Sequence, residues 1–282
     1  MIYLLDFREK VRGIYSSYKE YCTLAYKFIM SLITFIVIDV KLGFGNEFMN
    51  ALSVLLLALV GTFIPSSLTV LLACLVSVAC VFSYSPVLGF MLTILLIIVY
   101  AMFMRFVPKL AYAMLAVPIA YVFKLPVLVP IILGLVCTPI AVIPVICGTI
   151  VYYFILAIKS VESVSNSVNK VEALQVFIYV MRKFTENKAI FVSVILFFII
   201  TILVYVIRTR NIDHAYEIAI ICAGILYLFT YLVAAFNSDL GIGIVGIVLG
   251  AIISCAIAII VQFFICVLDY SSVENVQFED DD

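Results

Sequence analysis

The chain has 282 residues and a formal net charge of −1; 67% of its residues are hydrophobic and only 12% are charged. Soluble domains are nearer half apolar and a quarter charged, so the composition excludes an ordinary soluble domain. The near-zero charge gives no electrostatic basis for binding nucleic acid. Mean hydropathy is +1.32. Because a helix needs about 20 apolar residues to cross a bilayer, the sequence predicts an all-α polytopic transmembrane helical bundle with about 8–10 membrane segments.

Residues 1–20 mix apolar and charged side chains. Leu4, Phe7, Val11 and Ile14 recur at helical spacing, which predicts an amphipathic helix lying on the membrane surface. The interspersed charges exclude a secretory signal peptide, which needs an uninterrupted apolar core. Because four basic residues precede the first apolar run, the N-terminus is predicted to be cytoplasmic.

Residues 21–104 are predicted to form a unit of four spans. Its apolar runs cover residues 21–40, 48–63, 66–83 and 86–104, and short turns separate them. Each run approaches the length that a transmembrane helix requires.

The stretch 105–158 is as apolar as a span but cannot form a straight helix. Proline removes a backbone donor and clashes with the preceding turn. The carbonyl groups freed in this way must find partners inside protein or in a water-filled cavity, and transporters often place their substrate sites at such broken segments. Between the flanking charges Arg105, Lys109 and Lys159 there is one interior charge, Lys124. The stretch contains six prolines: Pro108, Pro118, Pro126, Pro130, Pro139 and Pro144.

Two pieces of this stretch, residues 110–123 and 125–136, are too short to cross a bilayer as helices. They predict either a hairpin of half-helices that meet near Lys124 or two short tilted spans buried by their neighbours. A further span, kinked at a proline, is expected over 139–158. The residues expected to line a transport path are Lys124, Pro126, Pro130, Thr138, Pro139, Pro144 and Gly148.

Residues 159–188 change from a serine-asparagine linker to a second amphipathic helix. Three further spans are predicted in 189–267, over residues 189–207, 212–235 and 240–267. The last span has closely spaced glycines that would let a neighbouring helix approach: Gly243, Gly246 and Gly250.

A cluster of charges lies between the first two of these spans. It contains Arg208, Arg210, Asp213, His214 and Glu217. One interpretation is a proton or cation site in which Glu217 titrates and His214 adjusts it, because residues three and four apart share a helix face. The other is that an arginine pairs with the carboxylates at the membrane surface and fixes the turn. The sequence favours the second.

A faint internal repeat is also present. Transporters are often built from duplicated units, although a chain so rich in Leu, Val, Ala and Gly also produces matches by chance. The first copy is Lys41-Leu42, LALVGT (57–62), Pro65 and Cys74; the second is Lys124-Leu125, LGLVCT (133–138), Pro139 and Cys147.

No motif for catalysis is found: there is no HExxH, no GxSxG, no Walker sequence and no pair of aspartates within a span. The eight cysteines lie in or beside apolar segments without metal-ligand spacing, and the chain has one histidine, so neither a metal site nor another cofactor is predicted. The sequence therefore does not predict an enzyme.

Three segments carry a resemblance to a known family: PVLVPIILGLVCTPIAVIPVICGTIVYY (126–153), IDHAYEIAI (212–220) and DYSSVENVQFEDDD (269–282). They resemble uncharacterised multi-pass membrane proteins of clostridial bacteria. The resemblance implies a protein of the plasma membrane of an anaerobic Gram-positive bacterium, with an acidic tail that continues into a tyrosine-rich, basic end. It implies no activity and no site residues.

Two functions are compatible with these patterns. The first is a permease-like protein that moves a small solute or ion along a path lined by the broken segment 108–148. The alternative is a non-catalytic scaffold or subunit of an export or envelope complex, in which the acidic tail 268–282 recruits a soluble partner such as an ATPase. Homo-oligomer formation is open in either case.

Overall fold

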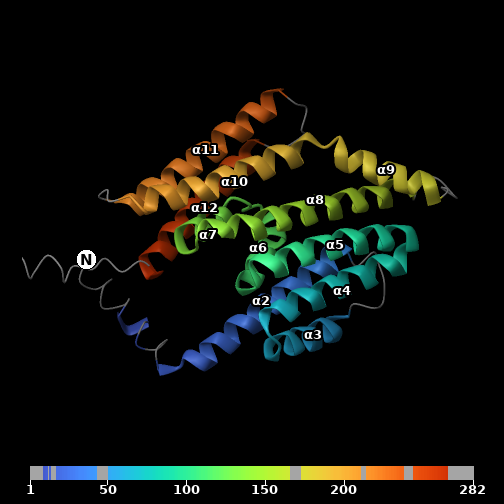
Figure 1. Ribbon diagram of the computed structural model, residues 1–282, viewed down its shortest axis with the longest axis horizontal. Helices are drawn as coiled ribbons and strands as arrows, with labels where there is room; N and C mark the ends of the chain where they lie inside the picture. The colour runs from blue at the N-terminus through green and yellow to red at the C-terminus, as the bar shows by residue number, and fades with distance from the viewer. Residues whose placement is uncertain are drawn as a thin grey trace, which may run out of the picture.

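The computed structural model describes residues 9–11, 13, 17–42, 50–165, 173–210, 214–237 and 244–265. Within these ranges all regular structure is helical, and seven helices are long and apolar enough to cross a membrane. The predicted all-α polytopic bundle is therefore confirmed (Figure 1).

The chain is built from long helices separated by a few short ones. In chain order they are α2 (Lys19–Leu42), α3 (Ala51–Phe63), α4 (Ser66–Tyr84), α5 (Pro86–Phe106), the 3-10 turn η1 (Pro108–Leu110), α6 (Ala111–Val122), α7 (Leu128–Val136), the 3-10 turn η2 (Pro139–Ala141), α8 (Val142–Ser165), α9 (Ala173–Thr185), α10 (Lys188–Arg208), α11 (Ala215–Asn237) and α12 (Ile244–Ile265).

Most predicted spans coincide with one long helix, and one does not. The run 48–63 forms α3, which has only 13 residues. At 1.5 Å per residue such a helix rises about 20 Å, short of the roughly 30 Å hydrocarbon core. Most of the predicted helix 1–20 and the whole tail 268–282 lie outside the described residues, and the scaffold alternative depends on those segments.

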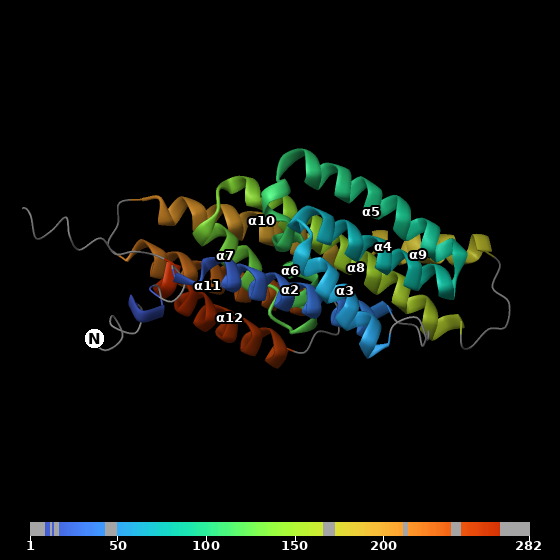
Figure 2. The ribbon, with the colours of Figure 1, turned by 90° about the horizontal axis from the view of Figure 1, so that it is seen from below.

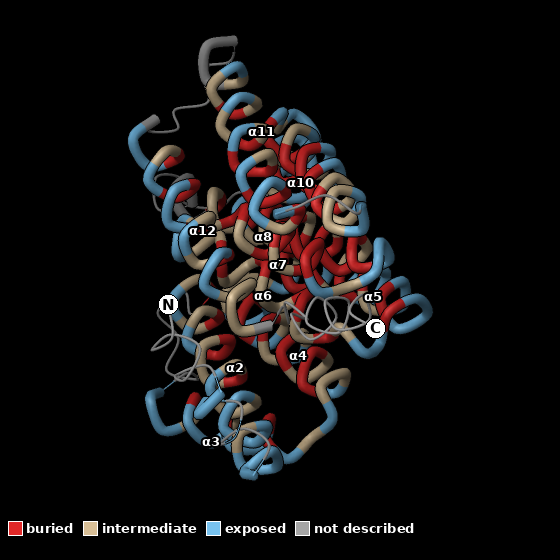
Figure 3. The backbone as a smooth tube through the Cα atoms, turned by 90° about the vertical axis from the view of Figure 1, so that its left-hand side faces the viewer, coloured by how far each residue is buried: buried red, intermediate tan, exposed pale blue. Residues whose placement is uncertain are grey.

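Helix α8 occupies the middle of the bundle. It packs against α6 and α5 on one side and against α10 on the other. Helix α11 lies beyond α10 in Figure 1, and α12 packs against α11 and α7. Figure 3 shows the buried residues concentrated around α7, α8 and α10. Large apolar side chains on the outer helices are exposed, for example Leu52 at 71%, Phe63 at 73% and Phe229 at 66%. A surface of this kind fits a lipid environment rather than water.

Helices α6 and α7 form a hairpin that enters the bundle and returns. Their 12 and 9 residues rise about 18 and 14 Å, too little to cross a bilayer. The end of α6 is level with the middle of α10, because the ring of Tyr121 lies 6.0 Å from that of Phe197. The end of α7 is level with the end of α10, where Arg208 contacts Leu135. Of the two predicted arrangements, the structure therefore has the hairpin of half-helices (Figures 1 and 2).

The turn of this hairpin is closed by backbone hydrogen bonds around Lys124. Lys124 has a positive φ of 61°, a left-handed conformation that glycine usually supplies. Its N–H donates to the carbonyl of Tyr121 over 3.1 Å, and the N–H of Leu125 donates to the carbonyl of Ala120 over 2.8 Å. This pair of bonds is a common way to end a helix, and it satisfies carbonyls that would otherwise be unpaired in an apolar environment.

The two copies of the faint sequence repeat share one local architecture. In each, a helix is followed by a short helix, a proline-containing break and a long helix: α2, α3 and α4 in the first copy, and α6, α7 and α8 in the second. Helices α6 and α8 run in the same direction, because Gly148 lies against Val117 and Tyr152 stacks on Tyr121. The motifs LALVGT and LGLVCT both fall at the end of the short helix.

Candidate functional site

Arg208 clamps the end of the short helix α7. It lies in the last turn of α10, and its guanidinium donates to the carbonyl of Leu135 and, over 2.9 Å, to the carbonyl of Cys137. The last carbonyls of a helix have no partner within it and carry partial negative charge. Because Pro139 cannot continue the helix or donate a hydrogen bond, a cation from α10 supplies the missing partner. Arg208 also lies over the ring of Tyr205, 5.3 Å from its centroid.

The hairpin turn rests on the last helix. The carbonyl oxygen of Lys124 would clash with a Cβ placed on Gly250 of α12, so only glycine allows this approach. The side chain of Lys124 is exposed. A lysine at the turn of a re-entrant hairpin is costly in lipid, and such residues usually face a protein-lined or water-filled space.

A hydroxyl cluster, made of Tyr121, Tyr153, Ser193 and Tyr231, is buried beside the end of α6. Its members come from α6, α8, α10 and α11. The hydroxyl of Tyr153 lies 2.7 Å from that of Ser193, which lies 2.8 Å from that of Tyr231. Ser193 is 0% exposed, so these two hydrogen bonds are shielded from solvent.

The hydroxyl of Tyr121 is buried and lies close to the hydroxyls of Ser193 and Tyr153, but it forms no hydrogen bond of ordinary geometry with any described residue. Its ring stacks on Tyr152 with centroids 4.1 Å apart and meets Tyr153 edge-on at 5.6 Å. A buried hydroxyl without a partner costs about 1–3 kcal/mol. Since hydroxyl groups both donate and accept, the Tyr121 hydroxyl leaves this cluster with hydrogen-bonding capacity for a further small polar partner, such as an ordered water.

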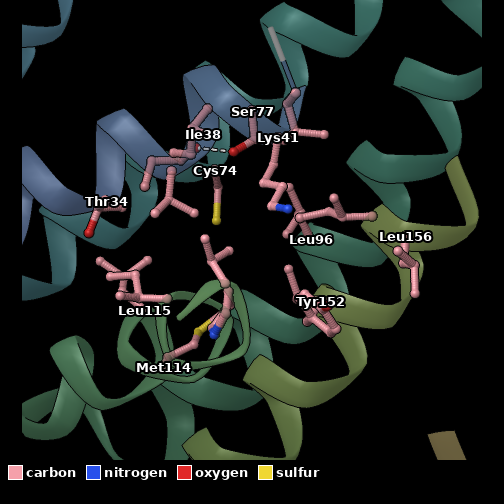
Figure 4. Close-up of a pocket in the computed structure, with 18 of the residues that line it drawn as sticks. Thr34, Ile38, Lys41, Cys74, Ser77, Leu96, Met114, Leu115, Tyr152 and Leu156 are labelled. Atoms are coloured by element: carbon pink, nitrogen blue, oxygen red, sulfur yellow. Dashed lines mark hydrogen bonds between the residues drawn. The ribbon is translucent and has the colours of Figure 1, made fainter. Parts of the chain in front are cut away.

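A cavity of about 120 Å³ lies between α2, α4, α5, α6 and α8. Its walls are mostly apolar and include Met114, Leu115, Pro118 and Ile119 from the hairpin helix α6. Figure 4 shows Cys74 and Lys41 directed into this space. The cavity and the hydroxyl cluster are neighbours, because Tyr152 lines the first and stacks on Tyr121 of the second.

Comparison of the chain with protein-family models, with curated proteins and with solved structures found no match. Function is therefore inferred from the geometry of the molecule itself.

The residues predicted to line a path lie at the breaks of the central segment or within α7 and α8, and not on the cavity wall. Lys124 forms the hairpin turn, Thr138 and Pro139 begin η2, and Gly148 gives α8 close contact with α6, since a Cβ there would lie 2.7 Å from Val117 Cβ. Pro130 is buried in the first turn of α7. None of the seven candidates lines the cavity of about 120 Å³. They shape the hairpin, while other residues of α6 face the open space.

The predicted charge cluster is split by the structure. Arg208 binds the carbonyl groups of α7 rather than a carboxylate, and Arg210 is exposed. His214 Nδ1 lies 3.3 Å from Glu217 Oε2, and both side chains are more than half exposed, at 75% and 53%. Asp213 lies outside the described residues.

Only part of the predicted glycine face has a close neighbour. Gly250 meets the backbone of Lys124, a turn rather than a helix, and no atom lies within 4 Å of a Cβ placed on Gly246. Gly243 lies outside the described residues. The close glycine contact between α11 and α12 is at Gly224, where a Cβ would lie 2.6 Å from Cys255 Sγ.

The hydroxyl cluster was not predicted from the sequence. Tyr227 and Tyr231, four residues apart on one face of α11, are both buried and their rings are 4.7 Å apart. This spacing is the one signal that the sequence contains, and it also fits ordinary packing. The partners Tyr153 and Ser193 belong to two other helices, and no sequence pattern links them to the pair Tyr227 and Tyr231.

Proposed function

We propose that this chain is a permease-like membrane protein that moves a small solute or ion along the re-entrant hairpin α6–α7. One observation carries the proposal: the hairpin turns part-way along the bundle, with Lys124 exposed at its tip, beside a buried hydroxyl cluster in which Tyr121 has no hydrogen-bond partner of ordinary geometry among the described residues. Non-helical backbone at membrane depth is tolerated where it lines a cavity or is enclosed by protein. Helices broken at depth are also typical of transporter binding sites.

The groups at this place favour a neutral or anionic solute. Lys124 supplies a positive charge at the turn, and the cluster supplies hydroxyl groups that donate and accept hydrogen bonds. Among the described residues, no carboxylate forms an ion pair with Lys124. A cation would therefore meet repulsion at the turn, whereas a polyol or a small anion would find complementary partners.

The experiment is an osmotic assay on liposomes that contain the purified protein. Vesicles are mixed with glycerol, a hexose, potassium chloride or potassium gluconate, with valinomycin added to the two salts so that K⁺ can follow the anion, and stopped-flow light scattering reports solute entry. The proposal expects at least one of these solutes to enter faster than it enters protein-free vesicles. Tyr121→Phe and Lys124→Gln should slow that entry about tenfold or more, the loss of one or two hydrogen bonds to the solute.

Lys109→Gln is the matched control, because Lys109 is exposed and lies in η1, away from the hairpin turn. It should leave the entry rate unchanged. If no solute enters faster than in protein-free vesicles, or if all three variants behave alike, the proposed path is wrong.

The location within the cell is part of the same proposal. A bacterial plasma membrane with a cytoplasmic N-terminus is supported by the basic residues that precede α2, because cytoplasmic flanks carry an excess of Lys and Arg. A protease-cleavable tag placed before Met1 should resist protease added to intact cells and be cut in lysed cells. Cleavage in intact cells would show that the N-terminus lies outside the cell and would contradict this orientation.

A further inference from the structure

The cavity between α2, α4, α5, α6 and α8 has two lysines at one end and mostly apolar walls elsewhere. Lys41 lies in the last turn of α2, and Lys159 lies near the end of α8. Both line the cavity together with side chains such as Ile38, Leu96 and Ile155. Both lysines are half-buried, so their ammonium groups lie at the margin between the apolar space and the surface.

Among the described residues, these two ammonium groups have few partners. The Nζ of Lys159 donates to the carbonyl of Val40 at 3.5 Å, a long bond. The side-chain ion pairs of the described residues, Arg182–Glu186 and His214–Glu217, involve neither lysine. An ammonium group has three donors, so most of the hydrogen-bonding capacity of this pair is left for an external anion.

The apolar part of the cavity is suited to a short length of hydrocarbon. An engineered cavity of about 150 Å³ holds one benzene molecule, so the volume of about 120 Å³ found here admits a few methylene groups. Leu156, which lines the cavity, is 47% exposed. The space therefore reaches the outer surface of the bundle, where an alkyl chain could continue into the bilayer.

We propose that this cavity is a binding site for an anionic phospholipid of the surrounding bilayer. The phosphate group lies between Lys41 and Lys159, and the first part of one acyl chain lies against Leu96, Met114 and Ile155. Basic pockets between transmembrane helices bind anionic headgroups for the same electrostatic reason. The cavity adjoins α6 but includes neither Lys124 nor the hydroxyl cluster, so lipid binding can be tested independently of transport.

The binding test uses native mass spectrometry of the purified protein in detergent. Equal amounts of phosphatidylglycerol and phosphatidylcholine are added, and laurate is added in a separate titration. The proposal expects phosphatidylglycerol to be retained in preference to phosphatidylcholine. Since a lysine near an anionic surface contributes about 1 kcal/mol, the variant K41Q/K159Q should lose about 30-fold in that preference. Lys109 and Lys183 are exposed lysines outside the cavity, so K109Q/K183Q should lose none.

Three outcomes would overturn the proposal. Equal retention of the two phospholipids would exclude headgroup selection. Equal losses in K41Q/K159Q and K109Q/K183Q would show that the preference comes from the overall charge. Retention of laurate but not of phosphatidylglycerol would assign the cavity to a free single-chain anion instead.

A second measurement locates the lipid without changing the protein. Cys74 lines the cavity, whereas Cys222 is a half-buried cysteine of α11 outside it. N-ethylmaleimide labelling of each cysteine is quantified by peptide mass spectrometry. Phosphatidylglycerol should slow the labelling of Cys74 several-fold and leave that of Cys222 unchanged. Equal effects on the two cysteines, or none, would show that the lipid does not occupy this cavity.

Discussion

Replacing Arg208 tests how the broken segment is held together. In Arg208→Gln the guanidinium no longer reaches the carbonyls of Leu135 and Cys137. Hydrogen bonds to a charged group contribute about 1.5–3 kcal/mol each. Arg208 is half-buried, so solvent compensates for part of the loss. The free energy of unfolding of the variant is expected to be about 3 kcal/mol lower than that of the parent protein, because the end of α7 is then left with unpaired carbonyl groups in an apolar environment.

The assay measures thermal unfolding of a fluorescent fusion of the protein, purified in mild detergent. After heating, size-exclusion chromatography reports the fraction that remains folded. Arg210→Gln is the matched control, because Arg210 is exposed two residues further along and exposed substitutions usually change stability by less than about 0.5 kcal/mol. Arg208→Lys should fall between the two, because lysine keeps the charge but not the planar fork that reaches both carbonyls. Hydrogen exchange should rise in α7 of Arg208→Gln and not in α4. Equal unfolding of the Arg208→Gln and Arg210→Gln variants would refute the clamp.

Three further substitutions test other contacts, each by the same unfolding assay. Lys124→Gly should raise stability by about 1 kcal/mol, because glycine adopts the φ of 61° without steric cost; a loss of stability would show that the lysine side chain supports the turn. Gly250→Ala should cost about 1–3 kcal/mol through its clash with the carbonyl of Lys124, whereas Gly246→Ala should be neutral or slightly stabilising; the reverse order would disprove this contact. Ser193→Ala should cost about 2 kcal/mol because it leaves two buried tyrosine hydroxyls unpaired, and Tyr231→Phe, which removes one bond, should cost less; equal effects would mean that the hydroxyl chain is not formed.

The hairpin could be predicted because its cause is local. The prolines around 108–144 and the lengths of the two pieces exclude straight spans, and both signals are visible within 37 residues of sequence. The sequence does not decide between a hairpin and two tilted spans, because that choice depends on where Tyr121 and Leu135 lie along α10. That relation is tertiary and has no local signature.

The partner of Arg208 could not be predicted for a similar reason. Asp213 and Glu217 carry negative charge and follow Arg208 closely in the sequence, so they are the natural candidates for its partner. The acceptors in the structure are backbone carbonyls 71 and 73 residues earlier. Every residue carries a carbonyl, and only the break after α7 makes these ones available. The sequence therefore identified both the broken helix and the arginine but not their contact.

The cavity and the hydroxyl cluster could also not be predicted from the sequence. Lys41 and Lys159 are 118 positions apart, and each one alone is typical of a lysine near the end of a span. The residues Tyr153, Ser193 and Tyr231 are likewise ordinary within their own helices. Their chemistry arises only because α2 meets α8, and because α8, α10 and α11 pack together.

The most direct test of the proposed path is the water accessibility of the hairpin turn. Lys124→Cys is placed in a variant whose native cysteines are replaced, and the protein in liposomes is treated with a charged methanethiosulfonate reagent that does not cross lipid. A path lined by the broken segment predicts that this cysteine reacts readily from the aqueous phase and that its modification slows solute entry. Reaction only with a lipid-soluble maleimide, with solute entry unchanged, would place the turn in lipid and contradict the account.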